Sequence, residues 1–545
     1  MKTWPIVAGS PNRSRSRLLT LNEISALMTC IALMIVLGWF CRNRMNPDAV
    51  HYLRLASYYV SGSPDLAVSG HWSPLISCLM APLLGMGIDP LVTARIVTGM
   101  SGLLFWFGSL FLLKRLGLPP LAVALGVWCL SFACASWSVA VITPDLLVAG
   151  LICFAVRATL ADDWILNWKR QCLVGGLWAL AYYGKAVALP LCILTCIGLA
   201  AWRVVFLGGA RAAGTRSVAL TLAVFLALTA PWVTLLSIKY HRFTISTAIR
   251  TNRVMIGPKS TSPVGPFYPA TTPEPGRISV FESFDYPTVW SPFESVGNAK
   301  YQLRLLFKNG IAIRNQFRTF DFFSIGFTSL FVVLILVLFE RALFRDKKWV
   351  WSLVPVLSLA AIYSTTNCND QRYFWVLLPF FLALAFGLAE LVVEKVGVSR
   401  ISKYSIFGLI ALSFTLNPLR NCVAIVRHRA EGKGVSSYRD MASRLKEKQL
   451  LGPVAGSSEQ SACRALYVAY FLNQPCLNLH RYYGDATPTT VTQFLNSKAR
   501  IIIVNRNEPV AKEFTDSRFR DLDKDLFGDS QAAAQSELKA FELLH

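Results

Sequence analysis

The sequence contains eleven separate runs of mainly apolar residues, most of them long enough to cross the hydrocarbon core of a membrane as a helix. Such a crossing needs roughly 20 residues. Of the 545 residues, 54% are hydrophobic and 16% are charged, against about 25% charged residues in soluble domains. We therefore expect a polytopic α-helical membrane protein. The predicted spans are Ile24–Phe40, Val92–Leu113, Leu121–Trp137, Asp145–Leu160, Cys172–Tyr183, Ala186–Phe206, Val218–Ile238, Phe322–Phe339, Trp349–Thr365, Tyr373–Val393 and Tyr404–Leu419.

Lysine and arginine residues are divided unevenly between the two ends of these spans. Nineteen lie in the N-terminal tail and the connections on its side, whereas the short connections at the other end hold five. Because basic residues accumulate on the cytoplasmic side, we expect a cytoplasmic N-terminus and, with an odd number of spans, an extracytoplasmic C-terminal segment. The first run reads as an uncleaved signal anchor. The net charge of +23 then needs no nucleic acid partner.

Three segments outside the spans are long enough to fold. We predict a membrane domain over residues 1–420, with outer loops at 41–91 and 239–321, and an extracytoplasmic α/β domain over 421–545. Apolar patterning in that tail predicts two short strands and three helices. The strands are expected over Gly452–Gly456 and Arg500–Val504, and the helices over Ala462–Leu472, Thr489–Lys498 and Ala511–Asp521.

The segment after the first span carries the most chemical information. Asn46 suits a helix N-cap and Pro47 a first helical position, which predicts a helix to about residue 59. Helical spacing places Asp48, His51 and Tyr52 on one side. The helix dipole favours the charged form of Asp48, so this carboxylate could accept a proton or hold a cation. It could equally serve only to cap the helix.

Aromatic residues mark the outer segments. Gly70–Leu84 is apolar but interrupted by Pro74 and Pro82, which is typical of a helix lying in the membrane interface, and Trp72 fits an aromatic belt. The aromatic residues of the long loop could line a sugar or lipid groove, or be ordinary core or belt residues. They are Phe267, Tyr268, Phe281, Phe284, Tyr286 and Trp290.

The order of these motifs resembles the GT-C glycosyltransferases, in particular the branch with protein O-mannosyltransferases and lipid A aminoarabinose transferases. The Pro-Asp helix and the Trp-Ser-Pro-Leu segment are similar to the first outer loop of that superfamily. One departure is Ala49, where many members have Glu, and this puts a metal site that needs a second carboxylate in doubt. The further matching motifs are Thr143-Pro-Asp145, Tyr183-Gly-Lys185, Ala230-Pro-Trp232, Asp370-Gln-Arg-Tyr373 with Leu378-Pro379, and Ala465–Leu472.

The resemblance implies transfer of a sugar, with inversion, from a polyprenyl-phosphate donor to an acceptor hydroxyl at the outer membrane face. Asp48 would be the catalytic base. Cations would bind the donor phosphate, with a divalent metal as a possible cofactor. The expected partners are the lipid-linked donor, membrane lipid and an acceptor protein, lipid or glycan, in a bacterial inner membrane. The cations are Lys185, Arg372 and Arg54, and the residues expected to orient the acceptor or a metal are Asp145, His51 and Tyr52.

Structural alternatives remain open for each residue. Lys185 could snorkel to the interface, Arg372 could form an ion pair with Asp370 or Asp145, and Asp145 could cap a helix after Pro144. His51 could be a packing residue. For the whole chain, the alternative is a transporter or flippase, which typically places ionisable residues near the bilayer midplane. The predicted spans are nearly free of such residues.

Overall fold

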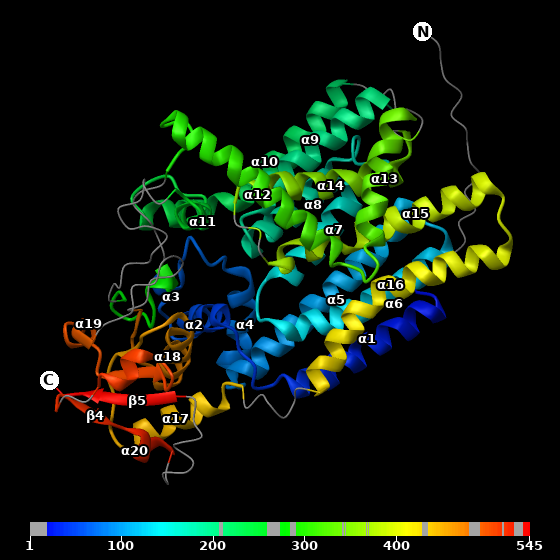
Figure 1. Cartoon of the computed structure of the whole chain (residues 1–545). Coiled ribbons are helices and arrows are strands. Elements are labelled where there is room, and N and C mark those ends of the chain that lie inside the picture. The colour runs from blue at the N-terminus through cyan, green and yellow to red at the C-terminus, as the bar shows by residue number, and fades with distance from the viewer. Residues whose placement is uncertain are drawn as a thin grey trace.

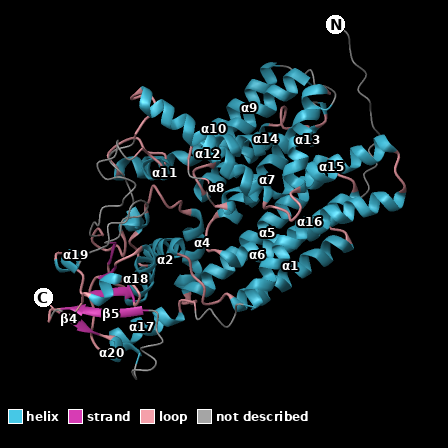
Figure 2. Cartoon of the chain, viewed as in Figure 1, coloured by secondary structure: helices cyan, strands magenta, loops and turns pink. Residues whose placement is uncertain are grey.

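The chain forms a helical bundle with a smaller sheet domain packed beside one end of it (Figures 1 and 2). This arrangement, seen in a computed structural model, confirms the predicted fold class. The basic N-terminal tail lies outside the described residues. The structure describes residues 19–206, 211–258, 273–283, 290–340, 343, 345–366, 368, 370–427, 434–478, 491–514, 517–527 and 538–544.

Every predicted span corresponds to a helix, but among the described residues seven, not eleven, are long and apolar enough to cross a membrane. Four predicted spans are helices of 15 to 18 residues. Of these, α7 is buried along nearly its whole length among α5, α8 and η3, so it need not present a full apolar length to lipid. The seven are α1 (Leu21–Phe40), α5 (Pro90–Leu116), α6 (Pro120–Ala140), α9 (Ala188–Phe206), α10 (Arg211–Lys239), the segment Gln371–Val396 formed by η3 (Gln371–Leu377) and α15 (Leu378–Val396), and α16 (Arg400–Arg427). The four are α7 (Asp145–Thr159), α8 (Trp168–Gly184), α13 (Ile325–Phe339) and α14 (Lys347–Ser364).

Ion pairs at one end of the bundle join connections that were predicted to share a side. Lys114, at the end of α5, pairs with Glu23 at the start of α1 at 2.8 Å. Arg115 donates to the Leu160 carbonyl at the end of α7 at 2.6 Å and pairs with Asp162 at 2.9 Å. The opposite end, where α2 lies, is called the α2 end below. The grouping of the connections into two ends therefore agrees with the sequence.

The first outer loop contains α2 (Pro47–Val60), α3 (Pro64–Ala67) and α4 (Leu75–Gly85). Helix α2 begins at Pro47 as expected, with Asn46 in the N-cap position. The Asn46 side chain makes no capping hydrogen bond. Instead it accepts the Ile142 N–H at 2.9 Å, so it ties the start of α2 to the loop that leads into α7.

The second outer loop contains a long helix that the sequence did not predict. This helix, α12 (Val296–Arg318), follows α11 (Ala248–Met255) and η1 (Val280–Ser283). Ser295 caps it by accepting the Asn298 N–H at 3.1 Å. The buried positions include Leu305, Asn309 and Ile313, spaced four apart and therefore on one face of the helix. Basic residues on the other face lower the average hydropathy, so no span was expected here.

The C-terminal domain is a five-stranded sheet in the order β2-β1-β3-β5-β4. Strands β1, β2 and β3 are parallel, and β5 runs antiparallel to β3 and β4. The strands are β1 (Val454–Gly456), β2 (Cys476–Asn478), β3 (Ile501–Asn505), β4 (Phe519–Asp521) and β5 (Leu538–Leu543). The helices are α17 (Ser436–Glu447), α18 (Glu459–Leu472), α19 (Val491–Leu495), η4 (Pro509–Lys512) and α20 (Asp523–Phe527).

One predicted helix of this domain is wrong. Both predicted strands and the helix over α18 are confirmed, and α19 covers part of the predicted helix Thr489–Lys498. The segment Ala511–Asp521 instead ends a 3-10 turn at Lys512 and enters β4. Phe514 packs between Phe519 and Phe541, with ring centroids 4.8 and 4.7 Å away. Cross-strand aromatic packing against β5 therefore outweighs a helix-like spacing of apolar residues.

The C-terminal domain docks directly on the first outer loop, where α18 lies beside α2 (Figure 1). The Tyr467 hydroxyl donates to the Met45 carbonyl at 3.0 Å. The Cys476 N–H donates to the Ile278 carbonyl of the second loop at 2.6 Å. The domain thus covers the residues that lead into α2 and holds both outer loops together.

Candidate functional site

Four segments that are distant in the sequence bring charged side chains together at the α2 end of the bundle. Asp48 belongs to the first turn of α2, and Asp145 is the first residue of α7. Lys185 directly follows α8, and Arg372 lies in η3. Each of the four residues lies at or beside the end of a helix. The alternating direction of the predicted spans therefore placed all four at the same end of the bundle. We call Asp48, Asp145, Lys185 and Arg372 the charged cluster.

Arg372 is the centre of the charged cluster. Its Nη1 lies 2.7 Å from Oδ2 of Asp48, and its Nε lies 2.8 Å from Oδ2 of Asp370 and 3.9 Å from Oδ2 of Asp145. Lys185 Nζ contacts Oδ1 of Asp145 at 2.6 Å. Asp145 therefore bridges the two cations. The pairing of Arg372 with Asp370 and Asp145, expected only as an alternative to phosphate binding, is present in the structure.

Burial makes this pairing strict. The Asp145 side chain is 5% exposed and that of Arg372 16% exposed, and a charge removed from water is costly unless it is paired. Burial by itself would lower the pKa of Lys185, but the Asp145 carboxylate outweighs it and raises that pKa above its ordinary value. Lys185 is thus a cation held by a buried partner. A lysine that only snorkelled to the interface would not need such a partner.

Two tyrosines form an aromatic wall beside the cations. Lys185 Nζ lies 4.3 Å from the centre of the Tyr373 ring, and the Arg372 guanidinium lies 5.5 Å from it. Tyr373 stacks on Tyr363 with centroids 5.3 Å apart. Such contacts stabilise cations by about 0.5–2 kcal/mol. The sequence position of Tyr373 next to Arg372 indicated that its ring would lie near the cations. Nothing in the sequence indicated that Tyr363 would lie there as well.

His51 and Tyr52 lie in an aromatic stack rather than in the charged cluster. The His51 ring stacks on Trp72 at 4.8 Å, and Tyr52 meets Trp72 edge-on at 5.2 Å. The Trp72 indole donates to the Phe281 carbonyl at 2.5 Å and is 9% exposed. The expectation that Trp72 belongs to an aromatic belt is therefore wrong, because the second outer loop covers it. Of the other loop aromatics, Trp290 is also buried, and Phe267, Tyr268, Phe284 and Tyr286 lie outside the described residues.

The burial of His51 predicts a loss of stability in acid. Burial lowers the pKa of His51 to about 3, against a smaller raising effect of Asp48, and lowers the pKa of the neighbouring His71 to about 4. The unfolded chain binds a proton near pH 6.5 and the folded chain does not, so stability falls as the pH drops below 6.5. For His51 alone we expect a loss of about 2 kcal/mol at pH 5.

Thermal unfolding of the purified protein between pH 5 and pH 7.5 measures this effect. The His51→Phe variant keeps the ring stack on Trp72 and removes the titrating group, so its unfolding temperature should fall less steeply in acid than that of the wild type. Equal slopes for the two proteins would refute the assignment. His241→Phe, at an exposed position outside the stack, is the control.

Arg54 does not join the charged cluster. Its Nη1 donates to Oδ1 of Asn473, at the end of α18, at 2.9 Å, and its Nη2 donates to the Tyr58 hydroxyl at 3.0 Å. Tyr58 in turn donates to Glu282 of the second outer loop at 2.6 Å. Arg54 therefore links α2 to the C-terminal domain and to the second loop, in contrast to the phosphate-binding role expected from its position in the sequence.

Replacing Arg54 separates docking from donor binding. Arg54→Ala should weaken the docking of the C-terminal domain by about 1 kcal/mol, which corresponds to roughly fivefold faster limited proteolysis between the domains. The affinity for a lipid-linked donor should not change. The control is Arg42→Ala, another arginine at the same end, whose guanidinium donates to the nearby Trp39 carbonyl. A variant with normal proteolysis and weakened donor binding would restore the phosphate-binding hypothesis.

The charged cluster does not have the form of a metal site. Among the described residues, no group of three or more His, Cys, Asp and Glu side chains is arranged to hold a metal ion. The Arg372 guanidinium lies between Asp48 and Asp145, in the space that a shared cation would need. The residues as arranged do not fit a divalent metal.

Comparisons with known proteins identify the fold. No protein-family model matches the sequence, and no curated protein sequence matches it significantly. The structure is similar to ArnT from Cupriavidus metallidurans bound to undecaprenyl phosphate, with a TM-score of 0.54, 15% identity, and coverage of 96% of this chain and 97% of that chain. The apo state of the same ArnT gives 0.52 and 16%, with coverage of 91% and 95%.

A second similar structure comes from an archaeon. The apo oligosaccharyltransferase of Archaeoglobus fulgidus matches with a TM-score of 0.54 and 12% identity, over 94% of this chain and 72% of that chain. ArnT and this oligosaccharyltransferase are GT-C glycosyltransferases. Identities this low show the fold alone, and that fold is GT-C, as the order of the motifs predicted.

Proposed function

We propose that this protein is a membrane glycosyltransferase that moves a sugar from a polyprenyl-phosphate donor to an acceptor hydroxyl at the outer membrane face. The observation that carries the proposal is the charged cluster, in which two carboxylates and two cations from four segments meet at one end of a GT-C fold. A transporter would place such groups near the bilayer midplane. Here they lie at helix ends, which favours transfer over transport.

The cations supply the donor site. The phosphate that leaves the sugar gains negative charge, and prepositioned cations stabilise that charge without reorganisation. Asp370 holds Arg372 at 2.8 Å, but its side chain is 48% exposed, and exposed ion pairs contribute little. A lipid phosphate can therefore take the place of Asp370 on Arg372 while Lys185 binds a second phosphate oxygen. The undecaprenyl phosphate bound to ArnT supports this class of lipid carrier.

Asp48 supplies the base. Its Oδ2 accepts from Arg372, and this contact orients the carboxylate so that Oδ1 can take the proton of an incoming hydroxyl. The acceptor oxygen bonds to the anomeric carbon from the face opposite the phosphate. The carbon–oxygen bond to phosphate breaks, and the electron pair leaves with the lipid phosphate. The base need not be strong, because phosphate is already a good leaving group.

The proposal includes an orientation in the membrane. The basic residues gather at the end opposite the charged cluster, which favours a cytoplasmic N-terminus and an extracytoplasmic C-terminal domain in a bacterial inner membrane. The acceptor, whether protein, lipid or glycan, would then meet the donor outside the cytoplasm, where Asp48 and the docked C-terminal domain lie together.

Mass spectrometry of envelope glycans, glycoproteins and lipids tests the proposal. Cells without the gene should lack one sugar on one class of acceptor, and the wild-type gene should restore it. The mass difference identifies the sugar, and the carrier molecule identifies the acceptor. Envelope material that is identical with and without the gene, in cells shown to express the protein, would contradict the proposed function.

A further inference from the structure

A cavity of about 290 Å³ lies beside the charged cluster, between the end of α6 and the C-terminal part of α16. This volume is at the lower end of the range of roughly 300–1,000 Å³ for ligand pockets, so the cavity suits one small headgroup. One of its lining residues is Gln371, which lies between Asp370 and Arg372 in the sequence and therefore places the cavity next to the charged cluster. The lining residues are Trp137, Thr319, Phe320, Gln371, Asn417, Pro418, Arg420 and Asn421.

The lining is rich in neutral amides. Three amide side chains and one hydroxyl line the cavity, together with one cation, Arg420, and no carboxylate. Asn417 donates to the Thr319 carbonyl and Gln371 to the Thr319 hydroxyl, each at 3.1 Å. The Asn421 side chain makes no hydrogen bond to the part of the chain that the structure describes. Amide groups therefore have hydrogen-bonding capacity to offer a ligand.

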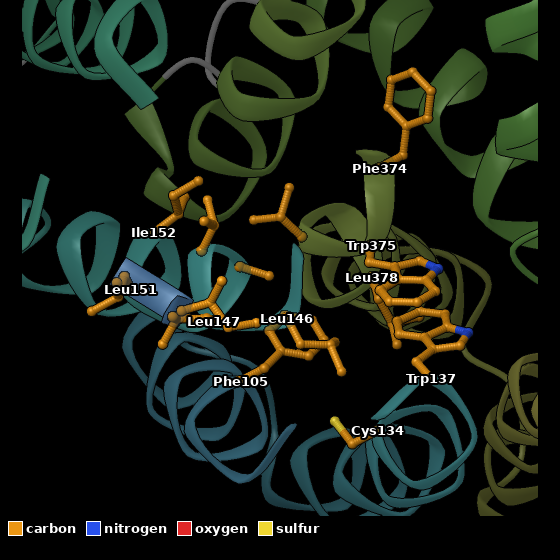
Figure 3. Packing of buried hydrophobic residues seen from close by; sticks show 14 of the residues in the cluster. Phe105, Cys134, Trp137, Leu146, Leu147, Leu151, Ile152, Phe374, Trp375 and Leu378 are labelled. Atoms are coloured by element: carbon orange, nitrogen blue, oxygen red, sulfur yellow. The ribbon is translucent and has the colours of Figure 1, made fainter. Parts of the chain in front are cut away.

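Two stacked indoles fix the wall of the cavity. Trp137 and Trp375 lie face to face (Figure 3). Their ring centroids are 4.8 Å apart and their planes differ by 3°. Trp375 follows Arg372 by one turn of η3. The indole wall and Arg372 are therefore joined through η3. A ligand in the cavity would lie at a fixed position relative to Arg372.

We propose that this cavity is a subsite for a sugar ring. Hydroxyl groups donate and accept at once, and amides match them because they do the same. A phosphate would instead need several cations or helix-terminal N–H groups, whereas the cavity has one exposed arginine. Trp137 is 5% exposed and stacks on Trp375, so it contributes a small apolar part of the lining, against which C–H groups of a sugar can pack. The inference rests on the proposed transfer reaction, which requires sugars at this end of the bundle.

The ring could come from the donor or from the acceptor, and the binding experiment distinguishes the two. Saturation-transfer-difference NMR is applied to the whole protein in nanodiscs, with a panel of neutral, N-acetylated and acidic methyl glycosides. At least one glycoside should bind. Addition of undecaprenyl phosphate alone should leave the signal in place. Loss of the signal with the same sugar on undecaprenyl phosphate assigns the subsite to the donor sugar, and its persistence assigns it to the acceptor.

Two variants and a control tie the signal to the cavity. Asn417→Ala combined with Asn421→Ala should weaken binding about tenfold, as expected for the loss of two neutral hydrogen bonds. Asn421→Ala alone removes no hydrogen bond made within the described residues, so it keeps the fold and should weaken binding about threefold. Ser405→Ala, whose hydroxyl donates to the Ile401 carbonyl within α16, should bind as the wild type does.

The outcome is separable from that of the proposed function. No binding of any glycoside to the wild type, or equal binding by the wild type and the double variant, overturns the subsite. A protein that binds a glycoside in the cavity but whose loss leaves envelope glycans unchanged keeps the subsite and loses the proposed transfer reaction.

Discussion

Replacing Asp48 with asparagine is expected to reduce sugar transfer by about 10²- to 10⁴-fold, the usual contribution of a general base. Asparagine has the same shape but does not take a proton at neutral pH. The variant should still fold, because Arg372 keeps its contact with Asp370 at 2.8 Å and Asp145 keeps Lys185 at 2.6 Å. Transfer is measured by restoration of the missing envelope sugar and by turnover of the purified protein with its lipid-linked donor.

The matched control is Asp65→Asn, an exposed aspartate in α3 of the same outer loop. It should transfer at the wild-type rate. Donor binding is the second readout, because a base is not needed to bind the lipid phosphate, and Asp48→Asn should bind donor about as well as the wild type. If Asp48→Asn transferred normally, the carboxylate would serve only the start of α2 and the base would have to be sought elsewhere in the cluster.

The charged cluster was predictable because helix ends and charge together determine a face of the bundle. Asp48, Asp145, Lys185 and Arg372 each flank an apolar run, and alternation of the spans assigns all four runs to one end. Few ionisable residues interrupt the runs, so there was little else in the membrane domain for a charged ligand to meet. The contacts among the four follow from burial, since unpaired charges would be costly there.

Other features depended on contacts between segments that the local sequence does not encode. Arg54 has the same flanking position as the cluster residues, yet Asn473, more than 400 residues further along the chain, is its partner. Trp72 looked like an interfacial residue because the cover over it comes from a distant loop. Helix α12 was not predicted because its basic residues lower the average hydropathy of a segment that also carries an apolar stripe. Strand β4 was not predicted because its structure depends on pairing with β5.

Replacing Arg372 with glutamine should have the largest combined effect on stability and transfer. Asp48 would lose its only cation among the described residues, and removing one partner of a buried pair costs about 3 kcal/mol or more. Transfer should fall by about 10²- to 10³-fold, because the leaving phosphate loses a prepositioned donor. Thermal unfolding and donor turnover measure the two effects, and Arg372→Lys should recover most of the stability and only part of the turnover.

The double variant Asp48→Asn with Arg372→Gln separates structure from chemistry. No unpaired charge remains at Asp48, so most of the lost stability should return, since neutral replacements on both sides of a buried pair are nearly neutral overall. Transfer should stay as low as in the single variants, because both the base and the phosphate ligand are gone. If transfer returned with stability, the pair would act only to join α2 to η3, and the charged cluster would lose its place at the centre of the proposed reaction.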